Sequence, residues 1–475
     1  MEINKILQII NCIFILVAIY LFKINGPNEF VDWNTIFLGG LLALEVHFFL
    51  AYSKKKINPF VIIVCIQLIF YYLMRIATLL YIPFSVVFNR NSISPEDTNY
   101  TIIFIIVSNL FLFAGLYSKS FLKPSPRFET NKEFDFKVKN LILLFLFAVL
   151  LGGSNIFGIS SVDRIFEVIK LLFLNPTIII FLTIVLVINN YYNFSFRQKL
   201  LFIMLFGGYI VLMTLNGSRA GAHLIAIYIL IALLSQSKVL KFKIKQILLI
   251  TFILPIVFIV FIFATELRSN DAIDGLSSKQ KFEVVKNSLS EDNRFITDIG
   301  LGIIFDRVGF LDYSTEIITY SNEYSSIFNF PYYFMSTIDN ALSPGFTVFD
   351  KPKVSNSLSY VYDNRGSPSL QSVNKFYASD ALTIFGEFYA LFYGWLSLII
   401  FFLVGYLFNS YYLNINYSSS LELYFKRALL ILIFYKLYNS FGIDWLIYDI
   451  IAIFFTYYFF KIIVFRKNIT NNIKT

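Results

Sequence analysis

The chain alternates long apolar stretches with short polar connections. A helix needs about 20 apolar residues to cross a hydrocarbon core about 30 Å thick. Twelve runs of roughly that length occur, at about residues 5–22, 35–52, 60–82, 100–118, 140–157, 174–190, 199–215, 221–236, 247–264, 382–408, 427–443 and 445–464. The run 382–408 is too long for one straight span, so we expect its first half to lie in the interface or to re-enter. The pattern predicts an all-α polytopic membrane protein with about 12 transmembrane helices.

The basic residues of the connections predict the orientation of these spans. Lysine and arginine accumulate in cytoplasmic loops. With the N-terminus in the cytoplasm, 22 basic residues fall on the inner side and only 5 in the short outer loops. Both termini are therefore predicted to be cytoplasmic, and the lipid bilayer is the chain's surroundings.

One connection is far longer than the others. Residues 265–380 form a polar segment of about 115 residues on the predicted outer side, with ten basic and fifteen acidic residues. Connections of this length are usually functional. The aromatic stretch 327–334 argues against a disordered linker, and we expect short helices packed over the membrane mouth. The predicted organisation is a membrane bundle with spans one to nine (1–264), a large extracytoplasmic loop (265–380), and a bundle with the last three spans and a cytoplasmic tail (381–475).

Composition excludes several classes of protein. With 57% hydrophobic and 15% charged residues, the chain is neither an ordinary soluble protein nor a disordered one. The net charge of +9 is largely a topology signal, so no nucleic-acid partner is expected. Two cysteines in apolar runs and two histidines are too few for a disulfide framework or a histidine-rich zinc cluster. No nucleotide-binding glycine loop is present, and we expect neither a metal nor a cofactor.

A glycine-rich turn joins the seventh and eighth predicted spans. In this Asn-Gly-Ser-Arg-Ala-Gly stretch (216–221), glycines permit a sharp turn, Ser218 adds a hydroxyl, and Arg219 can hold a phosphate with two hydrogen bonds. The amides at the start of the next helix would favour an anion. His223 would share a helical face with Arg219. The alternative is a tight hairpin whose arginine simply reaches water.

A second candidate is the aromatic segment that begins at Asp380 and continues through Gly386-Glu387-Phe388-Tyr389 to Trp395. Ionisation of Glu387 is costly in such apolar surroundings, so its pKa should be raised. This suits a general base or a clamp for a sugar hydroxyl. The alternative is an interfacial carboxylate paired with an arginine.

Charged residues inside other spans should find partners, because unpaired ions in hydrocarbon are expensive. Arg75 is expected to face Glu45 and His47, and Lys436 to pair with Asp444 or Asp449. Structural ion pairing is the favoured role for each. Four arginines of the long connection could together gather a pyrophosphate or an acidic glycan: Arg268, Arg294, Arg307 and Arg365.

The polytopic layout, the turn at 217–221, the large outer loop and the segment 386–395 together resemble the Wzy-type oligosaccharide repeat-unit polymerases of bacterial O-antigen and capsule synthesis. The topological likeness covers most of the chain, and the motif likeness about twenty residues. The resemblance implies a GT-C-like bundle in the bacterial inner (cytoplasmic) membrane, with an active site that faces outward.

The activity that this resemblance implies is glycosyl transfer. A glycan would pass from undecaprenyl pyrophosphate to a sugar hydroxyl of an incoming lipid-linked repeat unit, without nucleotide or metal. Arg219 would hold the pyrophosphate, and Glu387 would orient or deprotonate the hydroxyl. Partners could include a chain-length regulator protein.

Two other functions stay open at this point. O-antigen ligases have a similar bundle, but their pattern relies on a histidine in the large loop, and residues 265–380 contain none. A flippase or transporter of lipid-linked oligosaccharide could use midspan charges such as Arg75, Glu45 and Lys436. Such a protein should have comparably short loops throughout, so the long connection favours the polymerase.

Overall fold

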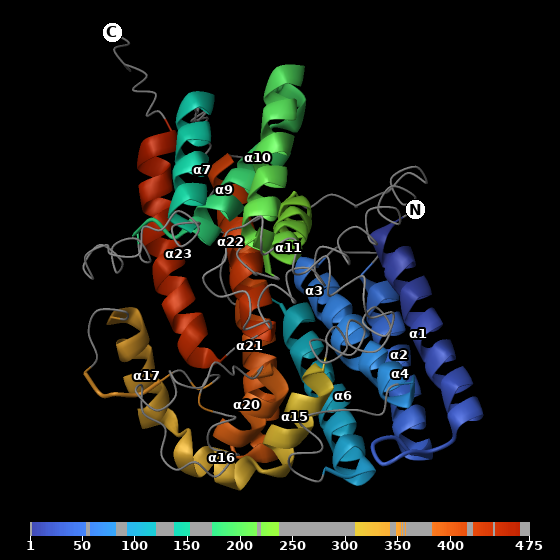
Figure 1. The fold of residues 1–475 in the computed structure, drawn as a ribbon. Coiled ribbons are helices and arrows are strands. Elements are labelled where there is room, and N and C mark those ends of the chain that lie inside the picture. Colours follow the sequence, from blue (N-terminus) through green and yellow to red (C-terminus); the bar gives the residue numbers. More distant parts are fainter. Residues whose placement is uncertain are drawn as a thin grey trace, which may run out of the picture. The chain divides into compact units, whose positions relative to one another are not determined.

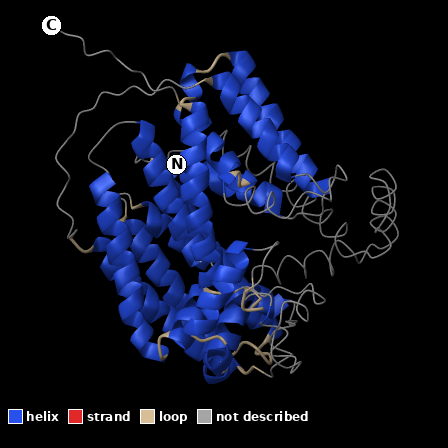
Figure 2. Ribbon diagram, turned by 90° about the vertical axis from the view of Figure 1, so that its left-hand side faces the viewer, coloured by secondary structure: helices blue, strands red, loops and turns tan. Residues whose placement is uncertain are grey.

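The computed structural model describes residues 2–53, 58–81, 93–119, 137–152, 173–215, 220–236, 309–342, 348–352, 354, 357, 382–415, 421–439 and 442–465. Within these ranges the chain contains helices and no β-strand (Figure 2). The prediction of an all-helical protein is confirmed for this part of the chain.

In the first half of the chain, the described residues form ten main helical elements. They are α1 (Ile3–Asn25), α2 (Trp33–Tyr52), α3 (Pro59–Gln67), the π-helix η1 (Leu68–Leu73), α4 (Met74–Tyr81), α6 (Pro95–Tyr117), α7 (Val138–Gly152), α9 (Pro176–Asn189), α10 (Phe196–Leu215) and α11 (Ala220–Ser235). The second half contributes α15 (Phe310–Thr319), α16 (Ser321–Ile327), α17 (Phe330–Leu342), α20 (Ile384–Leu391), the 3₁₀ turn η5 (Gly394–Leu396), α21 (Ser397–Ile415), α22 (Leu421–Tyr438) and α23 (Ile443–Val464) (Figure 1).

Seven described helical stretches are long and apolar enough to cross a membrane. They are Ile3–Asn25, Trp33–Tyr52, Pro59–Tyr81, Pro95–Tyr117, Phe196–Met213, Gly394–Ile415 and Leu446–Val464. Three shorter apolar helices cover Val138–Leu151, Pro176–Asn189 and Leu224–Ser235. These helices support a membrane protein, whereas the count of twelve spans stays a prediction. The run 247–264 lies outside the described residues.

Two of the predicted apolar runs do not coincide with single helices of the structure. The run 382–408 is broken, as its length indicated: α20 ends at Leu391, and Tyr393 and Gly394 adopt left-handed conformations (φ 56° and 67°) before α21 begins. The predicted span 427–443 is wrong at both ends, because α22 covers Leu421–Tyr438. Apolar residues continue from α22 into α23 and hide the intervening turn at Gly442, whose φ is 122°.

The chain forms two compact units. Unit 1 consists of Met1–Pro124, Leu301–Asn414 and Ile433–Asp449, and unit 2 consists of Ser125–Gly300, Ile415–Leu432 and Ile450–Thr475. Part of the long connection therefore belongs to the same unit as the first six helices. The three-part division by topology stays a prediction. In unit 2, α7 and α11 pack on α9, and Asn140 donates to the carbonyl of Ile463 (2.8 Å) in α23.

Helix α1 turns its polar side chains toward its neighbour and its apolar side chains outward. Amide side chains donate to carbonyls of α2: Asn4 to Leu50 (3.1 Å), Gln8 to His47 (3.2 Å) and Asn11 to Ala43 (2.8 Å). Large apolar residues such as Leu16 and Ile24 are exposed. Polar contacts between helices and an apolar exterior are what a lipid environment favours, so this pair of helices supports membrane insertion independently of helix length.

Two glycines allow α6 and α21 to cross at backbone contact. A Cβ added at Gly405 would lie 2.2 Å from the carbonyl oxygen of Leu112, and one at Gly115 would lie 2.2 Å from that of Phe402. Small residues permit this close approach of transmembrane helices. The crossing fixes α21, and with it the break after α20, against the N-terminal helices of unit 1.

We predict that Gly405→Ala lowers the stability of the purified protein by about 1–3 kcal/mol, because the added methyl forces the two backbones apart. Gly40→Ala is the matched control, since nothing lies within 4 Å of a Cβ at that helical position. It should be neutral or stabilise by up to about 1 kcal/mol. Thermal unfolding in detergent measures both, and equal effects of the two variants would contradict the crossing.

Candidate functional site

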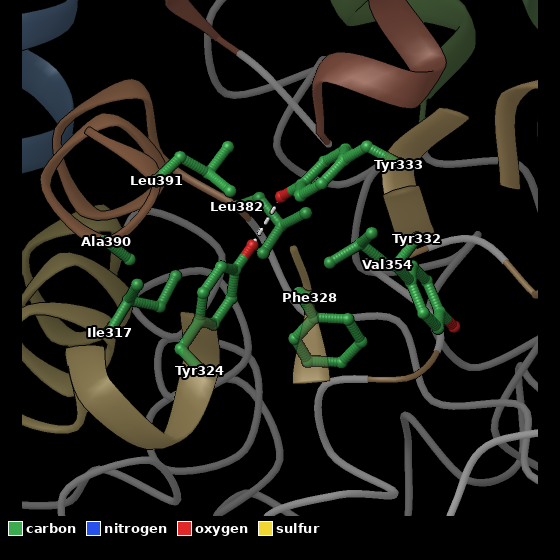
Figure 3. Close-up of a cluster of buried hydrophobic side chains, with 9 residues drawn as sticks. All are labelled: Ile317, Tyr324, Phe328, Tyr332, Tyr333, Val354, Leu382, Ala390 and Leu391. Atoms are coloured by element: carbon green, nitrogen blue, oxygen red, sulfur yellow. Dashed lines mark hydrogen bonds between the residues drawn. The ribbon is translucent and has the colours of Figure 1, made fainter. Parts of the chain in front are cut away.

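Helices α15, α16 and α20 lie side by side in unit 1 and enclose an aromatic core (Figure 1). The core consists of Ile317, Tyr324, Phe328, Tyr332, Tyr333, Val354, Leu382, Ala390 and Leu391 (Figure 3). It joins residues of the long connection to the segment that carries Glu387. Gly386 is required at this junction, because a Cβ there would lie 2.9 Å from the Cβ of Ile317 in α15.

Glu387 lies in the first turn of α20, which Thr383 caps by accepting from the amide of Gly386 (3.2 Å). Its side chain is fully buried. One carboxylate oxygen accepts from the hydroxyl of Tyr333 (2.5 Å) and from the backbone amide of Ile443 (3.0 Å). Because Ile443 begins α23, the carboxylate also lies at the positive end of that helix dipole.

Two tyrosines continue the chain of hydrogen bonds that ends at Glu387. The Tyr324 and Tyr333 hydroxyls are 2.5 Å apart (Figure 3). Since Tyr333 donates to Glu387, its oxygen accepts from Tyr324. Burial and then the charge of Glu387 raise the pKa of Tyr333 well above its ordinary value. The arrangement holds a buried carboxylate in one orientation and links it to two phenols in one buried hydrogen-bond network.

A second carboxylate lies close to the same helix end. Asp444, in the first turn of α23, accepts from the hydroxyl of Ser336 (2.8 Å) and from the amide of Val354 (3.2 Å). Both donors belong to the stretch after α16, so this contact holds α17 and the residues beyond it against α23. Asp444 is thus not the partner of Lys436. Lys436 forms an ion pair with Asp449, as one of the two predicted alternatives required.

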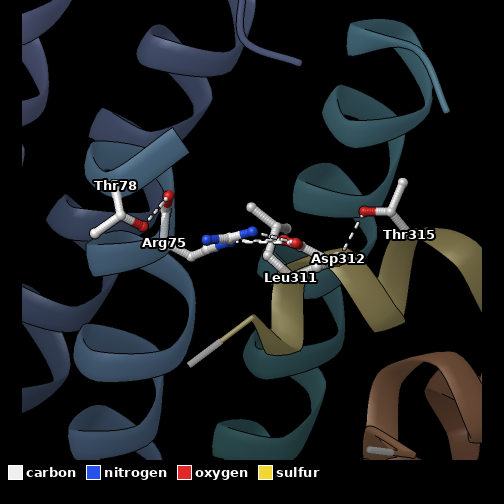
Figure 4. A network of polar contacts seen from close by, with 5 residues as sticks. All are labelled: Arg75, Thr78, Leu311, Asp312 and Thr315. Atoms are coloured by element: carbon white, nitrogen blue, oxygen red, sulfur yellow. Dashed lines mark hydrogen bonds and ion pairs between the residues drawn. The ribbon is translucent and has the colours of Figure 1, made fainter. Parts of the chain in front are cut away.

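Arg75 does not pair with Glu45 or His47, and that prediction is wrong. Its guanidinium binds Asp312 of α15 through Nε (2.9 Å to Oδ1) and Nη2 (2.5 Å to Oδ2) (Figure 4). Both side chains are buried. The partner lies 237 positions away in the long connection, which short-range spacing cannot reveal. His47 is exposed, and Glu45 is buried elsewhere in the bundle.

A row of hydroxyl groups connects the helix of Arg75 with the helix of Glu387. The Tyr72 hydroxyl lies 3.4 Å from that of Ser314, which lies 2.6 Å from that of Thr383, the cap of α20. Ser314 follows Asp312 by half a helical turn of α15. One short polar helix therefore connects Arg75 in the third span with the helix that carries Glu387.

The structure does not describe the side chains of the other predicted site residues. Ser218, Arg219, Arg268, Arg294, Arg307, Arg365 and Asp380 lie outside the described residues. His223 belongs to α11 in unit 2, and its side chain also lies outside the description. Of the predicted residues, Glu387 and Arg75 are described, and both lie in unit 1.

Sequence reasoning missed the residues that hold Glu387. Tyr333 belongs to the aromatic stretch 327–334, which indicated only order, and Tyr324 lies just before it. The partner of Arg75 was missed as well, because Asp312 is one of fifteen acidic residues in the long connection. The available signal was the helical spacing of Asp312, Thr315 and Glu316, which are all buried in α15. In the described part of the chain, no group of three or more His, Cys, Asp and Glu side chains could hold a metal ion.

Arg75→Met should lower the free energy of unfolding by about 3–5 kcal/mol, because it leaves the Asp312 carboxylate buried without its guanidinium. Asp312→Leu should cost a similar amount. The double variant Arg75→Met/Asp312→Leu should recover much of the loss, since two apolar residues then replace the pair. Thermal unfolding of all four proteins measures the coupling, and strictly additive losses would show that the two residues do not interact.

Tyr333→Phe should destabilise the protein by about 1–3 kcal/mol at neutral pH, because Glu387 loses a donor and Tyr324 an acceptor. The raised pKa of Tyr333 adds a pH dependence: its stabilising contribution is complete below about pH 10 and is lost as the pH rises further. The variant should therefore lose less stability than the wild type in alkaline buffer. Tyr393→Phe is the control, since Tyr393 is 84% exposed; the same response from both variants would contradict the buried hydrogen bond.

No protein-family model, curated protein or solved structure matches the chain. The sequence motifs and the contacts around Glu387 and Arg75 are therefore the observations that bear on the protein's function.

Proposed function

We propose that the protein is a polymerase of lipid-linked oligosaccharide repeat units, for O-antigen or capsule, in the bacterial cytoplasmic membrane. It would transfer a glycan from undecaprenyl pyrophosphate to a sugar hydroxyl of an incoming repeat unit at the outer face. The observation that carries the proposal is the folding of α15–α17, from the long connection, onto the helix that presents Glu387.

The buried contacts of these helices support a functional role for the long connection. α15 brings Asp312 to Arg75, α17 brings Tyr333 to Glu387, and Ser336 follows to reach Asp444. A connection that only joined two spans would not need buried ionic and hydrogen-bonded contacts at three places. Such contacts fit a rigid support that positions groups for a reaction at the membrane surface.

The proposed roles of the two motif residues differ. Arg219 would hold the pyrophosphate and stabilise the charge that develops as this group leaves. Glu387 is fully buried, so its described contacts fit a positioning residue that fixes Tyr333 and the start of α23. The pyrophosphate linkage itself supplies the driving force, in keeping with a chain that lacks a nucleotide-binding glycine loop.

A flippase or transporter of lipid-linked oligosaccharide is the second candidate. The observation that favours it is Glu45, a carboxylate buried inside a membrane-spanning stretch, because intramembrane ionisable residues often line transport paths. The folded helices of the long connection favour the polymerase over this alternative. A ligase-like transferase is less well supported, since residues 265–380 contain no histidine.

We test the proposal by deleting the gene, complementing the deletion strain with variants, and analysing the surface glycan on a gel. We expect the deletion strain to display glycan one repeat unit long, since transport across the membrane persists and elongation stops. Complementation with Arg219→Ala should still give glycan one repeat unit long. Arg219→Lys should restore little polymerisation, because a point charge replaces a two-pronged donor. The control Arg197→Ala, an exposed arginine at the other end of α10, should restore the full ladder on a gel.

Membrane levels of each variant are measured in the same cells, so that failed insertion is recognised. Complete absence of surface glycan in the deletion strain would indicate a flippase. A normal ladder in the Arg219→Ala strain would contradict the role of that arginine.

A further inference from the structure

Glu45 is a carboxylate inside the second membrane-spanning helix, and it has no hydrogen-bonding partner among the residues that the structure describes. It lies in α2, more than one helical turn from either end, and only 8% of its surface is exposed. Neither carboxylate oxygen makes a hydrogen bond to any described residue. An ionised carboxylate in such surroundings would carry the full cost of lost hydration without compensation.

Other polar groups without partners lie at the same depth. α2 and α6 run side by side, and residues at the same level differ by 64 in sequence number. Thr35 donates to Asn99, and Phe49 stacks on Phe113. This register places Asn109 opposite Glu45. Asn109 and the preceding Ser108 are fully buried. In the described part of the chain, neither the Asn109 amide nitrogen nor the Ser108 hydroxyl has a hydrogen-bonding partner.

A third helix contributes a matching group. α3 runs antiparallel to α6, since Asn58 at its start donates to the carbonyl of Leu116 near the end of α6. Nine residues further along, Gln67 therefore reaches the level of Ser108. The side-chain amide nitrogen and oxygen of Gln67 are both buried, and neither finds a hydrogen-bonding partner within the described ranges.

The backbone of the third span changes form directly after Gln67. Residues Leu68–Leu73 form the π-helix η1, and the amide of Met74 bonds to the carbonyl of Ile69 five residues back. π-helical turns inside α-helices are rare and frequently mark functional sites. This backbone feature is independent of the unpartnered side chains, and it lies at the same level of the bundle.

No cation among the described neighbours of Glu45 neutralises it. Arg75, the buried cation of α4, is engaged by Asp312, while Lys5 and Lys23 of α1 are exposed near the two ends of that helix. The titratable groups within electrostatic range of Glu45 are the Cys65 thiol of α3 and the Tyr438 hydroxyl of α22. Tyr438 in turn donates to the Asn109 side chain (2.9 Å). On α2 itself, His47 is exposed.

We propose that Glu45 is an intramembrane proton-binding site, whose carboxyl group carries a proton in this conformation, with Gln67, Ser108 and Asn109 as the polar groups that face it. The ligand is a proton, because a neutral carboxyl group removes the charge that no described side chain compensates. Gln67, Ser108 and Asn109 supply hydrogen-bonding groups toward which the carboxyl group can turn. This inference does not depend on the proposed polymerase activity, and it would hold for a transporter equally.

Infrared spectroscopy of the full-length protein in liposomes at neutral pH tests this site. The spectrum of the wild type minus that of Glu45→Gln should contain the carbonyl band of one protonated carboxylic acid. Glu29→Gln is the matched control, since Glu29 is exposed to water; its difference spectrum should lack the band. A carboxylate band in the Glu45→Gln difference spectrum would overturn the proposal.

A second measurement uses the wild type alone and decides the question if Glu45→Gln fails to fold. Dicyclohexylcarbodiimide modifies protonated carboxyl groups in apolar surroundings, and peptide mass spectrometry should locate the adduct at Glu45 and not at Glu29. Absence of the adduct at Glu45 would overturn the proposal. Suppression of the reaction by sodium ions at constant pH would also overturn it, because a metal ion would then be the ligand.

Discussion

A charged group inside an apolar helical bundle must be paired, hydrogen-bonded or neutral, and unit 1 is organised around this constraint. Arg75 in the third span satisfies it through Asp312, which a helix of the long connection supplies. Removal of one partner would cost several kcal/mol, whereas the pair itself adds little net stability. The ion pair therefore matters mainly because it specifies where α15 docks, and α15 in turn meets α20 at Gly386.

The same constraint explains the surroundings of Glu387 and Asp444. Each carboxylate is buried, and each accepts hydrogen bonds from a helix of the long connection and from the backbone of a neighbouring segment. The helices α15–α17 are thus held by polar contacts at three separate places, in addition to their aromatic core. Among the described carboxylates discussed in unit 1, Glu45 is the exception. It satisfies the requirement only if it is neutral, which is why we assign it a proton.

The sequence was sufficient for the features that depend on local pattern. Apolar runs of membrane-crossing length predicted helices such as α1, α2 and α6, and the excessive length of 382–408 predicted the break between α20 and α21. It was insufficient where partners are distant in the chain. The cost of unpaired ions in hydrocarbon predicts that Arg75 faces Glu45 and His47. Its partner Asp312 becomes close only after the long connection has folded back. Tyr333 was hidden for the same reason, since nothing in an aromatic run indicates which hydroxyl will meet a carboxylate.

The proposal of glycan polymerisation is based on the helices folded from the long connection and the contacts of Glu387, together with the turn that the sequence predicts at Arg219. The most direct test is reconstitution of the purified protein in liposomes with the lipid-linked repeat units that accumulate in the deletion strain. If the protein is a polymerase, we expect the reconstituted liposomes to form a ladder of longer glycans without added nucleotide. Movement of intact repeat units across the bilayer, with no increase in glycan length, would contradict it.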